Sequence, residues 1–263
     1  MAFSENPAFA DEPNAPSTAV SARGYTNRRV CARVRSGTDA FTGAAMARRY
    51  RALLWDNDGI LVDTERWYFA ACRDALTDVS IELTPDLYLE HWLSSSGGIL
   101  ELAQSRGLSA ATIAALQLKR NELYQRHLEE QELPFPGTQA ALAALRPHYT
   151  MGIVTSAYRH HFEAIHRRTG FLQYVDFVLA AGDYPRSKPE PDAYLAGIAR
   201  TGVPVNECLA IEDTPRGLAA ARAAGLDCWV IPTPLTAAAD FTGATRIFAS
   251  ITDVAEALLP ADN

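Results

Sequence analysis

Two aspartates, Asp56 and Asp58, are separated by one residue; they follow an apolar run and precede Gly59. In an extended segment, side chains at positions i and i+2 point to the same side, so both carboxylates can face one substrate. One carboxylate can attack phosphorus and form an acyl phosphate, and the other can protonate the leaving group and later deprotonate water. We therefore expect Asp56 to be a nucleophile and Asp58 a general acid and base. The same pair beside a glycine is also typical of a solvated turn.

Other residues with useful chemistry lie at the ends of later apolar runs. Thr155 and Ser156 end one run, Glu212 and Asp213 end another, and Lys188 lies in the loop SKPEPD at residues 187–192. Taken singly, each has an ordinary structural interpretation, such as a solvent-facing loop cation for Lys188. The ends of parallel strands meet at one edge of a sheet, however, so these residues are expected to share a pocket.

Carboxylates that crowd into such a pocket repel one another unless a cation is present. The candidate ligands offer only oxygen atoms, with no histidine or cysteine among them. Oxygen ligands favour Mg²⁺ over zinc or copper, and Mg²⁺ typically takes one or two carboxylates together with a substrate phosphate. The sequence therefore predicts a magnesium site that works on phosphate.

The elements that must position these residues alternate between strand and helix. Apolar runs predict strands at residues 51–55, 150–155, 175–181, 208–212 and 228–231. Helical patterns predict helices at residues 138–145 and 216–224, and helices that begin near residues 160 and 192. This series indicates an α/β fold with a parallel sheet that is covered by helices on both faces.

Residues 65–133 contain only helical patterns, such as the apolar spacing within residues 109–130. We interpret them as a helical insertion, with residues 46–64 and 134–263 forming the α/β core. Residues 1–45 are rich in Pro, Ala, Ser and Arg without apolar periodicity and are predicted to be a disordered extension. An over-extended start, an organelle transit peptide and a functional tail are all compatible with that composition.

The composition excludes several classes of function. The 263 residues carry a formal net charge of -7, which disfavours nucleic acid as a partner. Apolar runs are too short for a membrane span, and no secretory signal is visible. Four cysteines without paired spacing argue against a zinc cage or a disulfide framework and suggest the cytoplasm. A small phosphorylated metabolite is the expected partner, for a chain that is a monomer or a weak dimer.

Four segments then resemble, in order, the four motifs of the haloacid dehalogenase superfamily. They are LLWDNDGILVDTE at residues 53–65, VTSA at 154–157, SKPEPD at 187–192 and AIEDTPRGLAAARAAG at 210–225. The resemblance covers nearly everything after Tyr50. The fourth motif and the helical insertion are similar to the branch that contains β-phosphoglucomutase, phosphoglycolate phosphatase and sugar-phosphate phosphatases. The resemblance implies a Rossmann-like core with a mobile helical cap that excludes water.

The resemblance also implies a role for each motif residue. Asp56 would be the nucleophile and a metal ligand, and Asp58 would be the acid and base whose backbone carbonyl also reaches the metal. Thr155 would hydrogen-bond the transferring phosphoryl group. Lys188 would balance the negative charges of the phosphoryl group and of Asp56.

Further site residues are expected around this set. Asp213 would bind the metal, and Glu212 would be a neighbouring acid that binds the metal or supports its ligands. Candidate substrate contacts are Gly59, Glu65, Ser96, Gly97, Ser156 and Arg159. The serines and glycines of residues 94–98 are equally compatible with a plain turn. His160 and His161 begin a helix and are expected on the surface.

Departures from the family patterns separate the possible activities. Asp58 argues for phosphate chemistry, since a departing halide needs no proton. Tyr68 stands where the mutase has a cap histidine, and Ala157, Tyr158 and Arg159 replace the residues that hold its second phosphate. These features favour a phosphatase over a phosphosugar mutase. A binding or regulatory protein without turnover is the alternative from another class, and the complete acidic set argues against it.

Overall fold

The computed structural model describes residues 49–95 and 98–259. Within them, six parallel strands form a sheet in the order β3-β2-β1-β4-β5-β6. The strands are β1 (Ala52–Trp55), β2 (Thr150–Tyr158), β3 (Phe177–Ala181), β4 (Cys208–Glu212), β5 (Asp227–Val230) and β6 (Arg246–Ile247). The predicted α/β fold class, with its parallel sheet, is therefore confirmed.

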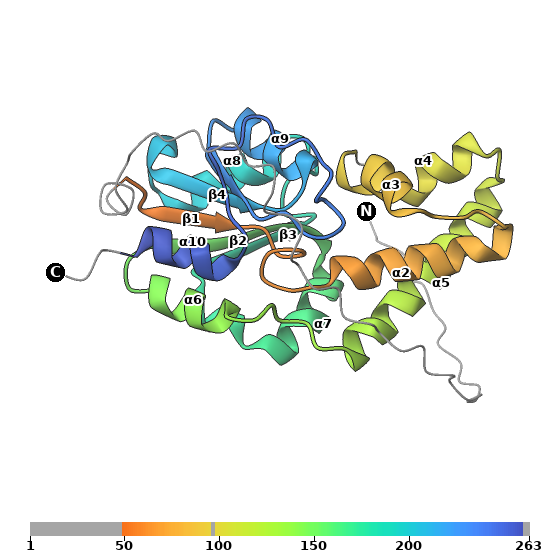
Figure 1. Cartoon of the computed structure of the whole chain (residues 1–263), viewed down its shortest axis with the longest axis horizontal. Coiled ribbons are helices and arrows are strands. Elements are labelled where there is room, and N and C mark those ends of the chain that lie inside the picture. The colour runs from red at the N-terminus through yellow and green to blue at the C-terminus, as the bar shows by residue number, and fades with distance from the viewer. Residues whose placement is uncertain (1–48, 96–97, 260–263) are drawn as a thin grey trace, which may run out of the picture. The chain divides into compact units, whose positions relative to one another are not determined.

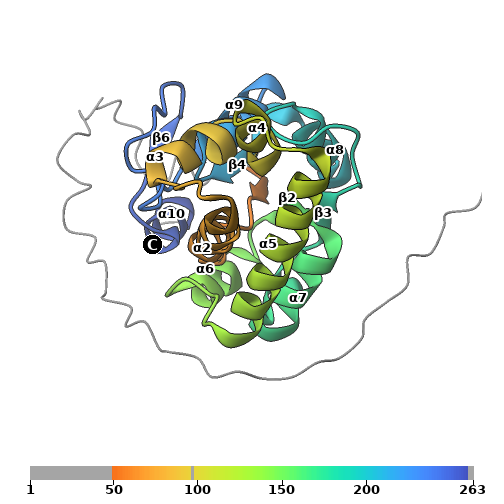
Figure 2. The same ribbon diagram turned by 90° about the vertical axis from the view of Figure 1, so that its right-hand side faces the viewer.

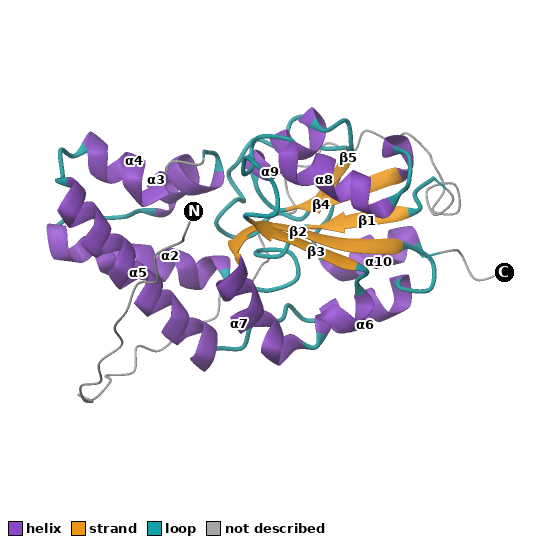
Figure 3. Ribbon diagram, turned by 180° about the vertical axis from the view of Figure 1, so that it is seen from behind, coloured by secondary structure: helices purple, strands orange, loops and turns teal. Residues whose placement is uncertain are grey.

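Helices cover both faces of the sheet, as Figures 1 and 3 show. One face carries α6 (Thr138–Leu145), α7 (Arg159–Thr169) and α10 (Ile251–Leu258), and the other carries α8 (Asp192–Thr201) and α9 (Pro215–Ala223). Successive side chains of β1 serve both layers: Leu53 and Trp55 join the first, and Ala52 and Leu54 join the second. All four are fully buried. A strand buried on both faces must read as a continuous apolar run, which is the pattern seen in the sequence.

Only helices occupy the described part of the predicted insertion, between β1 and β2. They are α2 (Glu65–Leu76), η2 (Thr77–Val79), α3 (Pro85–Tyr88), η3 (Leu89–Leu93), α4 (Gly98–Ser105) and α5 (Ala110–Glu130). Helix α2 packs along α5 (Figure 2), and Ser109 caps α5 by accepting a hydrogen bond from the backbone of Thr112. A separate apolar cluster that includes Leu76, Tyr88 and Leu116 gives the insertion its own core.

The chain enters and leaves the insertion through two segments that lie side by side. Val62 forms a bridge with Pro134, and the amide of Asp63 donates to the carbonyl of Leu133 at 2.7 Å. On the core side, Arg168 of α7 donates to the carbonyls of Leu128 and Glu129 at the end of α5, at 2.9 and 2.8 Å. Cations at a helix C-terminus satisfy carbonyls that lack a partner within the helix. The two connections thus give the insertion a narrow, anchored attachment.

The remaining described elements complete the chain. Two short 3-10 helices, η4 (Phe171–Tyr174) and η5 (Val205–Glu207), precede β3 and β4. Cys72, Cys208 and Cys228 are buried free thiols. Among the residues with described positions, no helix has both the length and the apolar character that a membrane span requires. The predicted extension at residues 1–45 and the candidate contacts Ser96 and Gly97 lie outside the described residues.

Candidate active site

The order of the strands brings three strand ends together. β1 lies between β2 and β4, and the chain runs outward from β1 through β2 and β3 on one side and through β4, β5 and β6 on the other. This reversal of strand order is the place where ligands bind in open α/β sheets. Asp56 follows β1, and its backbone amide donates to the carbonyl of Ile211 in β4 at 2.9 Å. The residues that end β1 and β4 are therefore neighbours.

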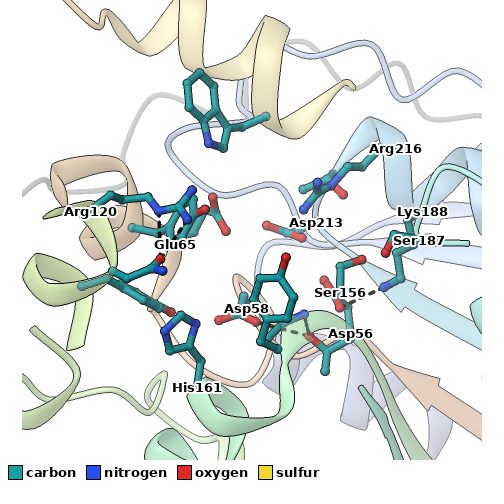
Figure 4. A pocket seen from close by; sticks show the side chains of 18 residues that line it. Asp56, Asp58, Glu65, Arg120, Ser156, His161, Ser187, Lys188, Asp213 and Arg216 are labelled. Atoms are coloured by element: carbon teal, nitrogen blue, oxygen red, sulfur yellow. Dashed lines mark hydrogen bonds and ion pairs between the residues drawn. The ribbon is translucent and has the colours of Figure 1, made fainter. Parts of the chain in front are cut away.

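A cavity of about 230 Å³ lies at these strand ends, between the core and the insertion. Core residues in its lining include Asp56, Asp58, Thr155, Ser156, Lys188 and Asp213. Residues from the insertion include Glu65, Tyr68, Trp92, Arg120 and Tyr124. Figure 4 shows Lys188 and Arg216 on the opposite side of the cavity from Arg120 and Glu65. The motif residues that lie far apart in the sequence thus share one cavity.

Lys188 is the buried cation of this cavity. Its ammonium group donates to Asp56 Oδ1 at 2.9 Å, to Glu212 Oε1 at 2.6 Å and to the carbonyl of Val154 at 2.9 Å. Burial alone would lower the pKa of Lys188, but the charges of Asp56 and Glu212 outweigh it and raise this pKa above its usual value. Lys188 therefore stays charged, with all three of its donor positions used.

Glu212 is fully buried and holds Lys188 from the β4 side. Tyr194 of α8 donates to the same Oε1 atom at 2.6 Å. Helix α9 begins beside it, where Thr214 caps the helix by accepting a hydrogen bond from the amide of Gly217 at 3.1 Å. A Cβ atom at Gly217 would overlap the Glu212 carboxylate, so only glycine allows the helix to pass this close. These contacts fix the side chain of Glu212.

Asp213 differs from Glu212 because both of its carboxylate oxygens are buried without a hydrogen-bond partner within the described chain. Burial, followed by the charges of Asp56 and Glu212, raises the pKa of Asp213 well above its usual value. One oxygen each from Asp56, Glu212 and Asp213 lie within 4.8 Å of one another. An unpartnered carboxylate beside two others is the arrangement that a divalent cation would relieve. The donor set consists of oxygen atoms and fits Mg²⁺.

Asp58 stands beside this cluster and is partly exposed to the cavity. Thr64 donates to its Oδ1 atom, and Thr155 donates to its Oδ2 atom at 3.4 Å. Burial raises the pKa of the Asp58 carboxyl group, the hydrogen bond from Thr64 opposes that rise, and the charge of Asp56 adds to it. A raised pKa favours the protonated carboxyl group that a general acid requires.

The candidate substrate contacts have different positions. Glu65 and Ser156 line the cavity. Gly59 is absent from the cavity lining and lies against Asp213, with a φ angle of +83°, where a Cβ atom would overlap the Asp213 carboxylate. Arg159 is exposed, forms an ion pair with Asp183 and is absent from the cavity lining. Arg159 thus lies outside the cavity, paired with Asp183 in the loop after β3.

Several cavity residues were not foreseen from the sequence. His160 is exposed, as expected. The surface position expected for His161 is wrong, because its side chain is buried. The ring of Tyr124 in α5 packs against the ring of His161, with the two ring centroids 5.2 Å apart. Arg120 and Tyr124 both line the cavity from α5. Their spacing of four residues places them on one helix face, which was a signal available in the sequence.

The wall formed by the insertion combines a cation with an acid. Arg120 stacks over the Tyr68 ring at 5.1 Å and donates to Asn121 Oδ1 at 2.8 Å. Tyr88 donates a hydrogen bond to Glu65. Burial raises the pKa of Glu65 to about 7, although the hydrogen bond from Tyr88 acts in the opposite direction. This wall can therefore offer both an anion-binding group and a weak acid to the part of a substrate farthest from the core.

Comparison with known proteins identifies the family. The model of the haloacid dehalogenase-like hydrolases matches residues 50–225. With this match, the parallel sheet and the acidic cavity, the chain belongs to the haloacid dehalogenase-like hydrolases. The resemblance seen in the four sequence motifs is thereby confirmed, and the chain is an enzyme of the hydrolase class.

Three similar proteins show the range of this family. The plasmid protein CbbY of Cupriavidus necator is 31% identical over 222 residues, covering 78% of this chain and 87% of that protein. The fructose-1-phosphate phosphatase YqaB of Escherichia coli is 28% identical over 184 residues, covering 69% of this chain and 96% of that protein. A crystal structure of a CbbY mutant from Rhodobacter sphaeroides with xylulose-(1,5)bisphosphate has a TM-score of 0.67 and 25% identity, covering 78% of this chain and 96% of that one.

Replacing Lys188 with methionine tests the buried charge arrangement. Lys188→Met leaves Asp56 and Glu212 without their shared cation, so we expect the free energy of unfolding to fall by about 3–5 kcal/mol. Urea unfolding measures the change. The matched control is Lys119→Met, which removes an exposed ion pair with Asp78 and should cost less than about 1 kcal/mol. Equal losses in the two variants would contradict the assigned role of Lys188.

Proposed function

We propose that this hydrolase is a Mg²⁺-dependent phosphatase that cleaves the phosphomonoester of a small metabolite through an aspartyl phosphate on Asp56. The observation that carries the proposal is the unpartnered, buried Asp213 carboxylate beside Asp56 and Glu212. Lys188 already pairs with Asp56 and Glu212, and the carboxylate of Asp213 could bind a further cation. An acidic protein that binds phosphate needs such local positive charge.

The proposed first step transfers the phosphoryl group to Asp56. Lys188 holds Oδ1 of Asp56, and the other carboxylate oxygen supplies the electron pair for the new oxygen–phosphorus bond. The bond between phosphorus and the leaving oxygen breaks, and that oxygen takes the proton of Asp58. Asp56 and Asp213, with the neighbouring Glu212, would hold Mg²⁺, which supplies charge stabilisation for the phosphoryl oxygens. Thr155, whose hydroxyl group makes only a long contact of 3.4 Å with Asp58, would turn to donate a hydrogen bond to the same group.

The proposed second step restores the enzyme. Asp58, now a carboxylate, takes a proton from a water molecule as that water attacks phosphorus. The oxygen–phosphorus bond to Asp56 breaks, inorganic phosphate leaves, and the carboxylate of Asp56 is regenerated. The insertion would cover the cavity during the first step and keep bulk water away from the leaving group.

The cavity suggests a substrate of modest size with polar groups. Its volume of about 230 Å³ and its position between the core and α5 suit a phosphorylated sugar or organic acid. Arg120 would bind the part of the substrate that is remote from the transferred group. The relatives support this class, since one is called a fructose-1-phosphate phosphatase and another was crystallised with a sugar bisphosphate.

Turnover with and without metal tests the proposal directly. The full chain should hydrolyse p-nitrophenyl phosphate when Mg²⁺ is present and lose that activity in a chelator, while Asp56→Asn should lower kcat by at least about 10³-fold. Released phosphate is the readout, and hexose 1-phosphate serves as a second substrate. Conversion of the hexose phosphate without phosphate release would indicate a mutase. No metal-dependent rate in the parent would support a binding protein instead.

Removing the charge of Asp213 should have opposite effects with and without metal. The folded-state pKa of Asp213 lies above its unfolded value, so the folded protein binds more protons, and its stability falls as pH rises from the ordinary carboxyl range towards that raised pKa. Without metal, Asp213→Asn should therefore be more stable than the parent at neutral pH.

Thermal unfolding in the presence of a chelator measures this difference, and addition of Mg²⁺ should raise the Tm of the parent but not that of the variant. Asp240→Asn, at an exposed aspartate, is the control and should leave both responses unchanged. A variant without metal that is less stable than the parent would contradict the uncompensated charge at Asp213.

Arg120→Met tests the role of the insertion in substrate recognition. If Arg120 binds the remote part of the substrate in the ground state and the transition state alike, the substitution raises KM and leaves kcat nearly unchanged. We expect kcat/KM to fall about tenfold for the best substrate from a panel of sugar phosphates. Arg126→Met, at an exposed position of α5, is the matched control. A fall in kcat alone would contradict this role.

A further inference from the structure

Asn57 is a buried polar residue between the two aspartates. Its side chain is fully buried and is absent from the lining of the cavity. Its amide nitrogen donates to Asp58 Oδ2 at 3.2 Å, and its amide oxygen lies 2.8 Å from His166 Nε2. The side chain therefore connects Asp58 with helix α7, behind the cavity wall.

His166 is the second member of this connection. It is 5% exposed, and its ring packs against Phe162 with the ring centroids 4.3 Å apart. Its other nitrogen, Nδ1, lies 2.8 Å from Thr169 Oγ1, which in turn accepts a hydrogen bond from the amide of Phe171 at 3.3 Å. A buried histidine with both nitrogens in short contacts has a fixed ring orientation.

The contacts favour one direction for the hydrogen bonds. The nitrogen of Asn57 donates to Asp58, which suits the carboxylate form of Asp58, so the amide oxygen needs a donor from elsewhere. His166 Nε2 is that donor, which makes Nδ1 the acceptor for the hydroxyl group of Thr169. Burial lowers the pKa of His166 to about 4, so the imidazole is neutral and carries the single proton that this assignment requires.

We propose that Asn57 and His166 are positioning residues that hold the Asp58 carboxyl group towards the leaving-group oxygen, an inference that rests on the proposed function. Neither residue touches the cavity, so both act through Asp58. Thr64 and Thr155 approach the two oxygens of Asp58 from other directions. The amide of Asn57 supplies the remaining contact, and the rigid ring of His166 keeps that amide from rotating.

Loss of the hydrogen bonds between Asp58, Asn57 and His166 should change how strongly kcat/KM depends on the basicity of the leaving group. A poorly aligned Asp58 transfers its proton badly, and the penalty grows as the leaving oxygen becomes more basic. Two aryl phosphates of similar size, p-nitrophenyl phosphate and phenyl phosphate, release a weakly and a more strongly basic oxygen. Their kcat/KM values report the step in which that oxygen departs. The ratio of the two values therefore measures proton delivery, whereas general damage to the site lowers both values together.

The test uses variants that remove one contact each from the full chain. His166→Phe keeps an aromatic ring beside Phe162 but removes the donor, and Asn57→Leu removes the amide. Both should raise the ratio of p-nitrophenyl to phenyl phosphate kcat/KM by about tenfold, part of the full effect of a general acid. The double variant should equal the single ones, because the two residues act in series. His166→Gln, which can still donate, should restore most of the parent ratio.

Thr169→Val provides a milder variant, in which the ring keeps its packing but loses the hydrogen bond that fixes its proton. We expect a smaller rise in the same ratio, with thermal unfolding close to that of the parent. An unchanged ratio in folded His166→Phe and Asn57→Leu, or an equal fall in both kcat/KM values, would overturn the positioning role alone. No turnover of either phosphate by the parent would overturn the proposed function together with it.

Discussion

The burial of three carboxylates beside one ammonium group is the constraint on which the site depends. Asp56, Glu212 and Asp213 lie at neighbouring strand ends, and Lys188 pairs with only the first two. Such a cluster is costly in a folded protein unless its charges are matched. The sheet supplies the rigidity that keeps the groups together, through the central position of β1 and the full burial of its side chains. The negative charge that Lys188 does not balance would be neutralised by a bound cation.

The insertion completes the cavity. The core supplies the acids, Lys188 with all its donor positions used, and Arg216, whereas Arg120 and Tyr124 line the same cavity from α5. Figure 4 shows Arg120 across the cavity from Arg216. The two connecting segments lie side by side, and Arg168 fixes the end of α5 to the core. In the proposed mechanism the core binds the reacting group and the insertion contacts the rest of the substrate, a division that would let one core serve many substrates.

Much of the fold could be predicted because buried parallel strands leave a strong pattern. The strand at Cys208–Glu212 and the helix at Thr138–Leu145 have the predicted limits. β6 was not predicted, since its two residues form a strand only by pairing with β5. Contacts between distant segments were also invisible: Arg159 turns to Asp183, and Tyr124 covers His161. The contact between Asn57 and His166 was invisible too, because the two residues lie 109 positions apart in the chain.

Transfer of the phosphoryl group to the carboxylate of Asp56 is tested most directly by the mass of the acid-quenched protein during turnover. In the presence of Mg²⁺ and p-nitrophenyl phosphate, a peptide that contains Asp56 should carry one added phosphoryl group. The addition should disappear in Asp56→Asn and in a chelator, and it should increase in Asp58→Asn if loss of the base slows hydrolysis more than transfer. Rapid turnover with no labelled peptide, or a label on a different residue, would contradict the account.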